Sequence, residues 1–215
     1  MQIKYNRSIR HKTIKYIVIH DTGNRNIGAN AMNNFNYFNS REVGSSADFF
    51  VDSKQALCVN DYKKYYTWHC GDGNGKYGIT NENSVGVEMC INSDGDYDTA
   101  FKNMVKCVKY LMSELNIPIE RVVRHYDASR KNCPQTFNNN GDWSKWYEFK
   151  QKLVENGDED EMIYNYIDKN MPEWARPTIQ KLVDKGLLKG NEKGELGLND
   201  TMLKIFVIND RAGLY

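Results

Sequence analysis

The ten residues from His125 to Pro134 combine a histidine, an aspartate, a lysine and a cysteine in one short polar stretch. Imidazole nitrogen and thiolate sulfur are ligands that bind zinc in preference to hard cations such as magnesium. The eight-residue spacing between His125 and Cys133 is longer than that of a zinc-finger knuckle, so the chain must fold back to bring both side chains to one ion. Two ligands do not hold a catalytic zinc, and a third is therefore expected elsewhere.

A candidate for this third ligand follows the first strongly apolar stretch. Residues 14–20 are rich in β-branched side chains and predict a central strand. The strand ends at His20, where the polar loop Asp21-Thr22-Gly23 begins, so the imidazole is well placed to face a cleft. The alternative is a strand-end histidine that only hydrogen-bonds to backbone, and this stretch taken by itself favours that alternative.

A second apolar stretch, residues 84–91, contains a glutamate. The alternation of a strand places Glu88 on the face opposite Val87 and Met89. Because a carboxylate is costly to bury unless it is paired or functional, Glu88 is a candidate general acid or base with a raised pKa. The alternative is a glutamate on a solvated face of the sheet.

Aromatic residues precede a glycine-rich loop at residues 65–75. Trp68 and His69 would form the wall of a groove for a sugar or a peptide. Alternatively, Trp68 covers the core and His69 is merely exposed, and the sequence does not decide between these two interpretations.

The composition is that of an ordinary globular protein of 215 residues with a net charge of +1, which gives no global attraction to nucleic acid. We find no apolar stretch that resembles a signal peptide or a membrane span, and expect no membrane insertion. The protein is therefore expected to be made in the cytoplasm and to stay there until it is released. Four of the five cysteines lie in or beside apolar segments and are expected to be buried free thiols, whereas Cys133 lies in a polar loop.

The remaining pattern predicts an α/β domain at residues 1–155, with a mixed central sheet flanked by helices. Helices are expected at 30–42, 99–115 and 144–154, a hairpin at 47–52 and 56–60, and a further strand at 121–124. An acidic linker at 156–162 leads to a small domain at 163–215 with helices from Pro172 and at 200–210. Its core is too small to be stable alone, so we expect this domain to dock on the first domain or on another copy of itself.

These candidates assemble into one kind of site. Three ligands, His20, His125 and Cys133, leave a tetrahedral position of Zn²⁺ open for water, as in catalytic zinc sites. Glu88 would take a proton from this water and pass it to a leaving amine, and Lys131 would stabilise an oxyanion. The sequence thus predicts metal-assisted hydrolysis of an amide.

Four segments in matching order, residues 18–22, 68–73, 83–88 and 125–134, resemble the zinc-dependent N-acetylmuramoyl-L-alanine amidases. This type-2 amidase group also includes the peptidoglycan recognition proteins. The resemblance covers residues 12–134 and implies a six-stranded or similar mixed sheet. It also implies cleavage of peptidoglycan between the lactyl group of muramic acid and L-alanine.

The motif match implies roles for individual residues. The zinc ligands are His20, His125 and Cys133, and the catalytic residues are Glu88 and Lys131. The expected substrate-binding residues are Asp21, Thr22, Trp68 and His69. We expect Asp127 to hydrogen-bond to a ligand histidine.

One departure from the family pattern concerns Ala47-Asp48-Phe49, where some members have Tyr-His-Phe. The missing tyrosine places the chain with the bacterial autolysins and phage endolysins, which rely on the glutamate instead. This leaves Ala47 without an expected role.

The tail resembles, more loosely, one S-layer-homology unit, which implies binding to cell-wall polymer; homodimerisation through this region is the alternative. Two other functions compete with the amidase prediction. One is a non-catalytic peptidoglycan-binding module on the same fold, which the presence of Cys133, Glu88 and Lys131 disfavours. The other is a zinc hydrolase that acts on a small cytosolic muropeptide, which a wall-directed tail disfavours.

Overall fold

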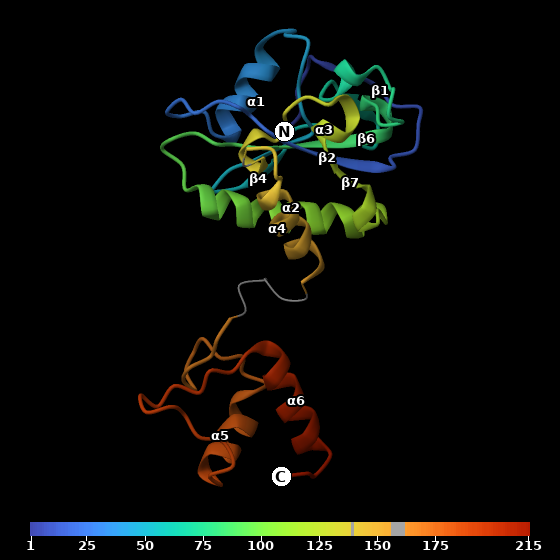
Figure 1. Cartoon of the computed structure of the whole chain (residues 1–215). Coiled ribbons are helices and arrows are strands. Elements are labelled where there is room, and N and C mark those ends of the chain that lie inside the picture. The colour runs from blue at the N-terminus through green and yellow to red at the C-terminus, as the bar shows by residue number, and fades with distance from the viewer. Residues whose placement is uncertain (139, 156–161) are drawn as a thin grey trace. The chain divides into compact units, whose positions relative to one another are not determined.

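The computed structural model describes residues 1–138, 140–155 and 162–215, and most of the predicted linker lies outside these ranges. Contacts divide the chain into two compact units, residues 1–155 and 156–215 (Figure 1). Each unit is described separately below.

The first unit is built on a mixed five-stranded sheet in the order β4-β3-β6-β2-β7. The strands are β2 (Tyr16–Asp21), β3 (Phe49–Val51), β4 (Ala56–Cys58), β6 (Ser84–Met89) and β7 (Val122–Arg124). β4 is antiparallel to β3, and the other pairs are parallel. The α/β prediction is therefore confirmed, with five strands in the main sheet where the resemblance implied about six.

A separate two-stranded sheet pairs β1 (Arg7–Ile9) with β5 (Tyr65–Thr67). The sequence patterns did not predict these strands. Each is only three residues long, so neither offers enough alternation to stand out from a loop.

Helices cover both faces of the main sheet (Figure 1). They are α1 (Ala31–Ser40), α2 (Tyr97–Leu115), α3 (His125–Ser129) and α4 (Ser144–Val154). The apolar stripe of α2 packs with Phe149 of α4 against Ile17 and Ile19 of β2. Val18 points to the opposite face, where it packs with Ala128 of α3. Because side chains alternate along a strand, the next residue on this second face is His20.

The long helix α2 begins two residues earlier than the sequence predicted. The side chain of Asp96 accepts a hydrogen bond from the backbone N–H of Thr99 and so caps the helix. The C-terminal end is set by Asn116, which adopts the left-handed conformation.

The second unit has its own small core between α5 (Arg176–Asp184) and α6 (Asp200–Arg211). The buried members of this core are Tyr164, Met171, Ala175, Ile179, Leu182, Leu198, Leu203 and Val207. The first helix begins at Arg176 and not at Pro172, because residues 172–175 form a turn that places Ala175 in the core. Among the described residues, no helix is long and apolar enough to cross a membrane.

Candidate metal centre

Two neighbouring strands bring the first pair of predicted site residues together. In the parallel register of β2 and β6, His20 is the partner of Glu88. Both side chains lie on the sheet face opposite α2, and His20 Nδ1 is 4.0 Å from Glu88 Oε1. His20 is buried, whereas one-fifth of the Glu88 side chain is exposed. The strand register therefore explains how residues 68 positions apart in the sequence share one site.

The strand β7 brings His125 to the same site. β7 pairs with the other edge of β2, and His125 is the first residue of α3, directly after β7. The rings of His20 and His125 lie edge to face with their centroids 4.7 Å apart. The first half of the polar stretch that begins at His125 is thus a short helix, which starts directly after the strand ends.

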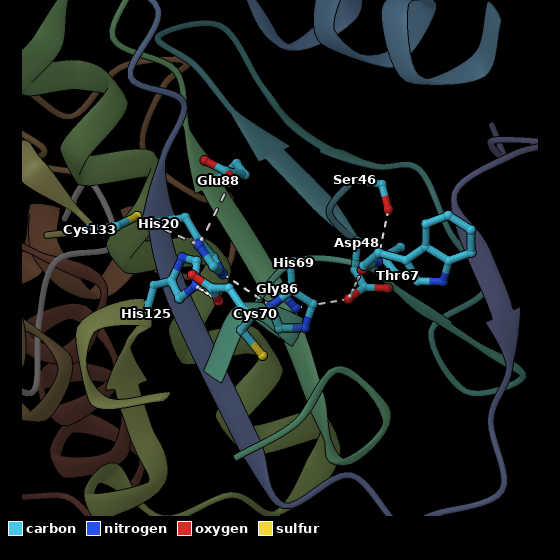
Figure 2. A network of polar contacts seen from close by, with 12 residues as sticks. His20, Ser46, Asp48, Thr67, His69, Cys70, Gly86, Glu88, His125 and Cys133 are labelled. Carbon is cyan, nitrogen blue, oxygen red and sulfur yellow. Dashed lines mark hydrogen bonds and ion pairs between the residues drawn. The ribbon is translucent and has the colours of Figure 1, made fainter. Parts of the chain in front are cut away.

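The chain after α3 folds back, as the eight-residue spacing requires. Arg130 adopts a left-handed conformation with φ of 72° and ends the helix. The backbone N–H of Tyr126 then donates to the carbonyl of Cys133 at 3.0 Å. This bond places Cys133 Sγ 3.7 Å from His20 Nδ1 (Figure 2).

His20, His125 and Cys133 each offer one ligand atom, and these atoms all lie within 4.8 Å of one another. All three side chains are buried. Two imidazoles and a thiolate are typical of zinc sites, and three protein ligands leave one tetrahedral position open.

The hydrogen bonds of His125 fit a metal ligand. Its Nε2 donates to Asp72 Oδ1 at 2.7 Å, while its Nδ1 is buried without a partner among the described residues. A histidine that donates one ring nitrogen to a carboxylate and offers the other to a metal is a common arrangement in metal sites. Asp72 is held by Ser129, whose Oγ donates to Oδ2, and by the close approach of Gly73 to Ala128. A Cβ at Gly73 would lie 2.0 Å from the Ala128 carbonyl oxygen.

The predicted role of Asp127 is wrong. Its two carboxylate oxygens accept hydrogen bonds from Arg124, through the backbone N–H and two guanidinium nitrogens. The carboxylate that supports a ligand histidine comes from Asp72, 53 residues away in the sequence. The sequence segment that resembled the family contained Asp72, but the helix α3 that pairs it with His125 was not predicted.

His20 has a different supporting partner. Its Nε2 lies 3.1 Å from Nδ1 of His69, and His69 Nε2 lies 3.1 Å from Ser84 Oγ. Both ring nitrogens of His69 therefore already have partners within the protein, and the residue is buried. The pKa of His69 is lowered to about 3, chiefly by burial and to a smaller extent by the nearby His125.

Burial also governs the ionisation of the other groups at the centre. The pKa of Glu88 is raised to about 8, chiefly by burial and also by the charge of Asp21, while the charge of Lys131 opposes this shift. Burial lowers the pKa of His20 well below its usual value, which leaves the ring neutral and able to bind a metal. Burial raises the pKa of the Cys133 thiol, and a divalent cation at the three ligand atoms would counter this by stabilising the thiolate. Cys133 is therefore buried, although the sequence placed it in a polar loop; all five cysteines are free.

The centre opens into a pocket of about 330 Å³. Its lining includes all the residues predicted as zinc ligands, catalytic residues or substrate contacts: His20, Asp21, Thr22, Trp68, His69, Glu88, His125, Lys131 and Cys133. Asp127 does not line it. Lys131 is exposed at this pocket. Thr22 Oγ1 is buried without a partner in the described part of the chain, and Trp68 Nε1 donates to Ser8 Oγ.

Asp21 and Ala47 contribute to the structure around the pocket. The carboxylate of Asp21 accepts hydrogen bonds from the backbone N–H and the hydroxyl of Thr136, at 2.7 and 2.8 Å, and so ties the end of β2 to the chain after Cys133. Ala47 is fully buried in the core, and the adjacent Ser46 lines the pocket.

Comparison with known proteins agrees with this fold and identifies the family of the chain. The profile of the Amidase_2 family, described as N-acetylmuramoyl-L-alanine amidase, matches residues 10–136. The chain therefore belongs to this family, and the resemblance drawn from the four sequence segments is confirmed.

Individual relatives show how much of the chain is shared. The amidase XlyA of Bacillus subtilis (strain 168) is 38% identical over 123 residues, which are 56% of this chain and 39% of XlyA. CwlH of the same organism is 37% identical over 123 residues, which are 56% of this chain and 47% of CwlH. The chain thus spans less than half the length of these curated relatives.

Solved structures resemble about seven-tenths of the chain. The catalytic domain of XlyA is 34% identical with a TM-score of 0.61, and the match covers 69% of this chain and 91% of that domain. PlyL is 33% identical with a TM-score of 0.61, and the match covers 73% of this chain and 99% of PlyL.

Proposed function

We propose that this protein is a zinc-dependent N-acetylmuramoyl-L-alanine amidase that cleaves peptidoglycan between the lactyl group of muramic acid and L-alanine. The observation that carries the proposal is the cluster of three buried ligand atoms, within 4.8 Å of one another, at an open pocket beside Glu88. Family membership supports the choice of amide bond.

His20 and His125 would hold zinc through their Nδ1 atoms, and Cys133 through its Sγ. Bound there, zinc supplies Lewis acidity, which polarises the carbonyl of the scissile amide and brings the pKa of a water to about 7. The soft donor set and the partnerless, buried Nδ1 of His125 support this assignment over a hard cation.

Glu88 is the proposed general base and acid. Its Oε2 is buried without a partner among the described residues, so it is available to a reacting group. Its raised pKa suits a group that accepts a proton from the attacking water and then donates it to the leaving nitrogen of L-alanine. Lys131, exposed at the same pocket, places a positive charge where the carbonyl oxygen gains negative charge.

Trp68 and Thr22 are the proposed substrate contacts. Trp68 forms part of the pocket wall, and Thr22 Oγ1 has no partner within the described residues, so it is free to hydrogen-bond to the stem peptide or the sugar. The carboxylate of Asp21 is already engaged by Thr136, so we assign it the secondary role of shaping the pocket.

The experiment that tests the proposal is mass spectrometry of peptidoglycan digested with the zinc-loaded protein. The expected products are stem peptides with a free L-alanine amino group and glycan strands with intact lactyl groups. If the zinc-loaded protein binds the polymer but releases no such peptides, it is a recognition module on the same fold. Equal rates on intact walls and on small soluble muropeptides would instead favour the cytosolic hydrolase.

For residues 163–215 we propose binding to cell-wall polymer, so that the enzyme acts on the wall after its release from the cytoplasm. The second unit exposes large apolar side chains, among them Trp174, Leu187 and Ile208, which are 44%, 62% and 64% exposed. Co-sedimentation of the full chain with purified walls tests this proposal, with a Trp174→Ala variant for comparison. A dimer in light scattering, without wall binding, would assign these side chains to self-association.

A further inference from the structure

His69 lies between a proposed metal ligand and a buried hydroxyl. Its ring meets that of His20 edge to face, with the centroids 5.2 Å apart and an interplanar angle of 89° (Figure 2). The two contacts of its nitrogens, to His20 Nε2 and to Ser84 Oγ, are both 3.1 Å long. Ser84 Oγ is in turn 2.5 Å from the carbonyl oxygen of Thr80.

The direction of each hydrogen bond in this series follows from its last member. The carbonyl of Thr80 can only accept, so the hydroxyl of Ser84 uses its one proton to donate to it. Ser84 Oγ must then accept from His69, which places the His69 proton on Nε2 and leaves Nδ1 as an acceptor. His69 Nδ1 accepts from His20 Nε2–H, so the lone pair of His20 is on Nδ1.

This lone pair lies where a metal would be bound. His20 Nδ1 is the atom 3.7 Å from Cys133 Sγ and 4.0 Å from Glu88 Oε1. We propose that His69 is a positioning residue, which fixes His20 in the tautomer and orientation that bind the metal. This role replaces the substrate contact expected of His69, and it rests on the metal site of the proposed function.

The His69 ring packs closely against the backbone of β6. Gly86 of β6 lies directly beneath it, and a Cβ at this position would be 2.5 Å from His69 Cγ. The peptide of Gly86 is itself fixed by Asp48, whose carboxylate accepts from the Gly86 N–H at 2.8 Å and whose N–H donates to the Gly86 carbonyl at 3.0 Å. Asn81 Oδ1 accepts from the backbone N–H groups of His69 and Cys70. His69 is therefore held by hydrogen bonds to its backbone and by contacts to its ring.

The two ligand histidines thus have supports of different charge. His125 donates to the carboxylate of Asp72, whereas His20 donates to the neutral ring of His69. Either support leaves Nδ1 of the ligand histidine free, because in each case the proton is held on Nε2. The proposed positioning role of His69 is therefore the counterpart of the role of Asp72.

The test compares two substitutions in the 215-residue chain, one of which removes the hydrogen-bond acceptor and the other the ring. His69→Phe keeps a ring but removes the acceptor, whereas His69→Asn removes the ring but offers Oδ1 near the position of Nδ1. Zinc affinity is measured by competition with a chromophoric chelator. We expect His69→Phe to weaken zinc binding about 10- to 100-fold, and His69→Asn to retain most of the wild-type affinity. Cys107→Ala, which removes a buried thiol from the core on the α2 side of the sheet, is the control and should change affinity by no more than about twofold.

Ser84→Ala provides a second test that leaves both histidines in place. Without the hydroxyl, nothing in the series fixes the proton of His69 on Nε2, so zinc affinity should fall by a smaller factor than in His69→Phe. Nitrogen-15 NMR of the imidazoles in metal-free protein should show a single Nε2–H tautomer for His20 in the wild type. The same spectrum should show mixed tautomers in Ser84→Ala, which keeps the inference testable if His69→Phe does not fold.

The outcomes separate this inference from the proposed function. Wild-type zinc affinity in His69→Phe, or equal losses in the Phe and Asn variants, would overturn the positioning role. A wild-type protein that binds no zinc would overturn both proposals. If zinc affinity follows the expected order but peptidoglycan is not cleaved, only the proposed function fails.

Discussion

His125 Nε2 donates to Asp72 Oδ1 at 2.7 Å, which turns the other ring nitrogen, a buried atom without a partner in the described part of the chain, toward the metal centre. Removal of the carboxylate in Asp72→Ala should therefore free the ring to take the other tautomer. We expect zinc affinity to fall about 10- to 100-fold. Chelator competition measures this, and Asp72→Asn, which still offers an oxygen acceptor, should lose less.

Asp127 provides the matched control for Asp72. It lies on α3 two residues after His125, but its carboxylate bonds to Arg124 and not to the histidine. Asp127→Asn should leave zinc affinity unchanged within about twofold. A loss as large as that of Asp72→Ala would mean that α3 as a whole, and not the Asp72 contact, positions His125.

The contrast between these two aspartates shows where sequence reasoning succeeds and where it ends. The central strands could be predicted because β2 and β6 are largely apolar, and the candidate site residues His20 and Glu88 stand out as polar side chains near their C-terminal ends. The expectation that Asp127 supports a histidine relied on proximity in the sequence. In the folded chain, the carboxylate near His125 comes from Asp72, in the short 3-10 helix Gly71–Gly73.

The role of His69 was equally hidden in the sequence. A histidine beside a tryptophan and before a glycine-rich loop resembles a groove wall, and the pocket does reach it. What decides its chemistry is the register that brings His20 and Gly86 to adjacent strands, together with the loop that lays the His69 ring on the glycine. No spacing or composition in residues 65–75 encodes this contact.

Glu88→Gln should separate catalysis from metal binding. The amide is nearly the same size as the carboxyl group, so the fold and the zinc affinity should be retained. It cannot exchange the proton, so kcat for release of L-alanine amino groups should fall by about 10²- to 10⁴-fold. Rates on purified peptidoglycan, measured with zinc content determined on the same samples, check this. A variant that keeps its zinc and at least a tenth of the wild-type rate would remove Glu88 from the proton transfer.

Gly86→Ala should destabilise the protein, because the added methyl group would clash with the His69 ring. The new Cβ would meet three atoms of the His69 ring at 2.5 to 2.9 Å, and the ring cannot move without losing His20 or Ser84. We expect a loss of about 1–3 kcal/mol in the free energy of unfolding, measured by urea denaturation, and weaker zinc binding. Gly95→Ala is the control, because the three atoms nearest to its new Cβ belong to the Asn92 side-chain amide, at 3.0 to 3.3 Å. Equal losses in the two variants would contradict the proposed packing of His69 on Gly86.

The stability of the metal-free protein should depend on pH through its buried histidines. Burial lowers the pKa of His69 to about 3, whereas an unfolded histidine titrates near 6.5. Between these values the unfolded chain binds more protons, so acidification should destabilise the fold by up to about 1.4 kcal/mol per pH unit for this residue. Glu88, with its pKa raised to about 8, acts in the opposite direction between pH 8 and 4.5, where the folded state binds the extra proton.

The pH dependence of the free energy of unfolding therefore contains opposing contributions. The informative quantity is the difference in this slope between the wild type and His69→Asn. His69→Asn removes one buried titrating ring and leaves Glu88 and His20 in place. Urea denaturation of EDTA-treated samples between pH 6 and 4.5 should show a slope for the variant that is smaller by up to about 1.4 kcal/mol per pH unit. Because the bond from His20 needs an acceptor at Nδ1, a neutral His69 is required both for this slope and for the positioning role. Identical slopes in the two proteins would mean that His69 accepts a proton in the folded state as readily as in the unfolded chain, and that it is not held neutral between His20 and Ser84.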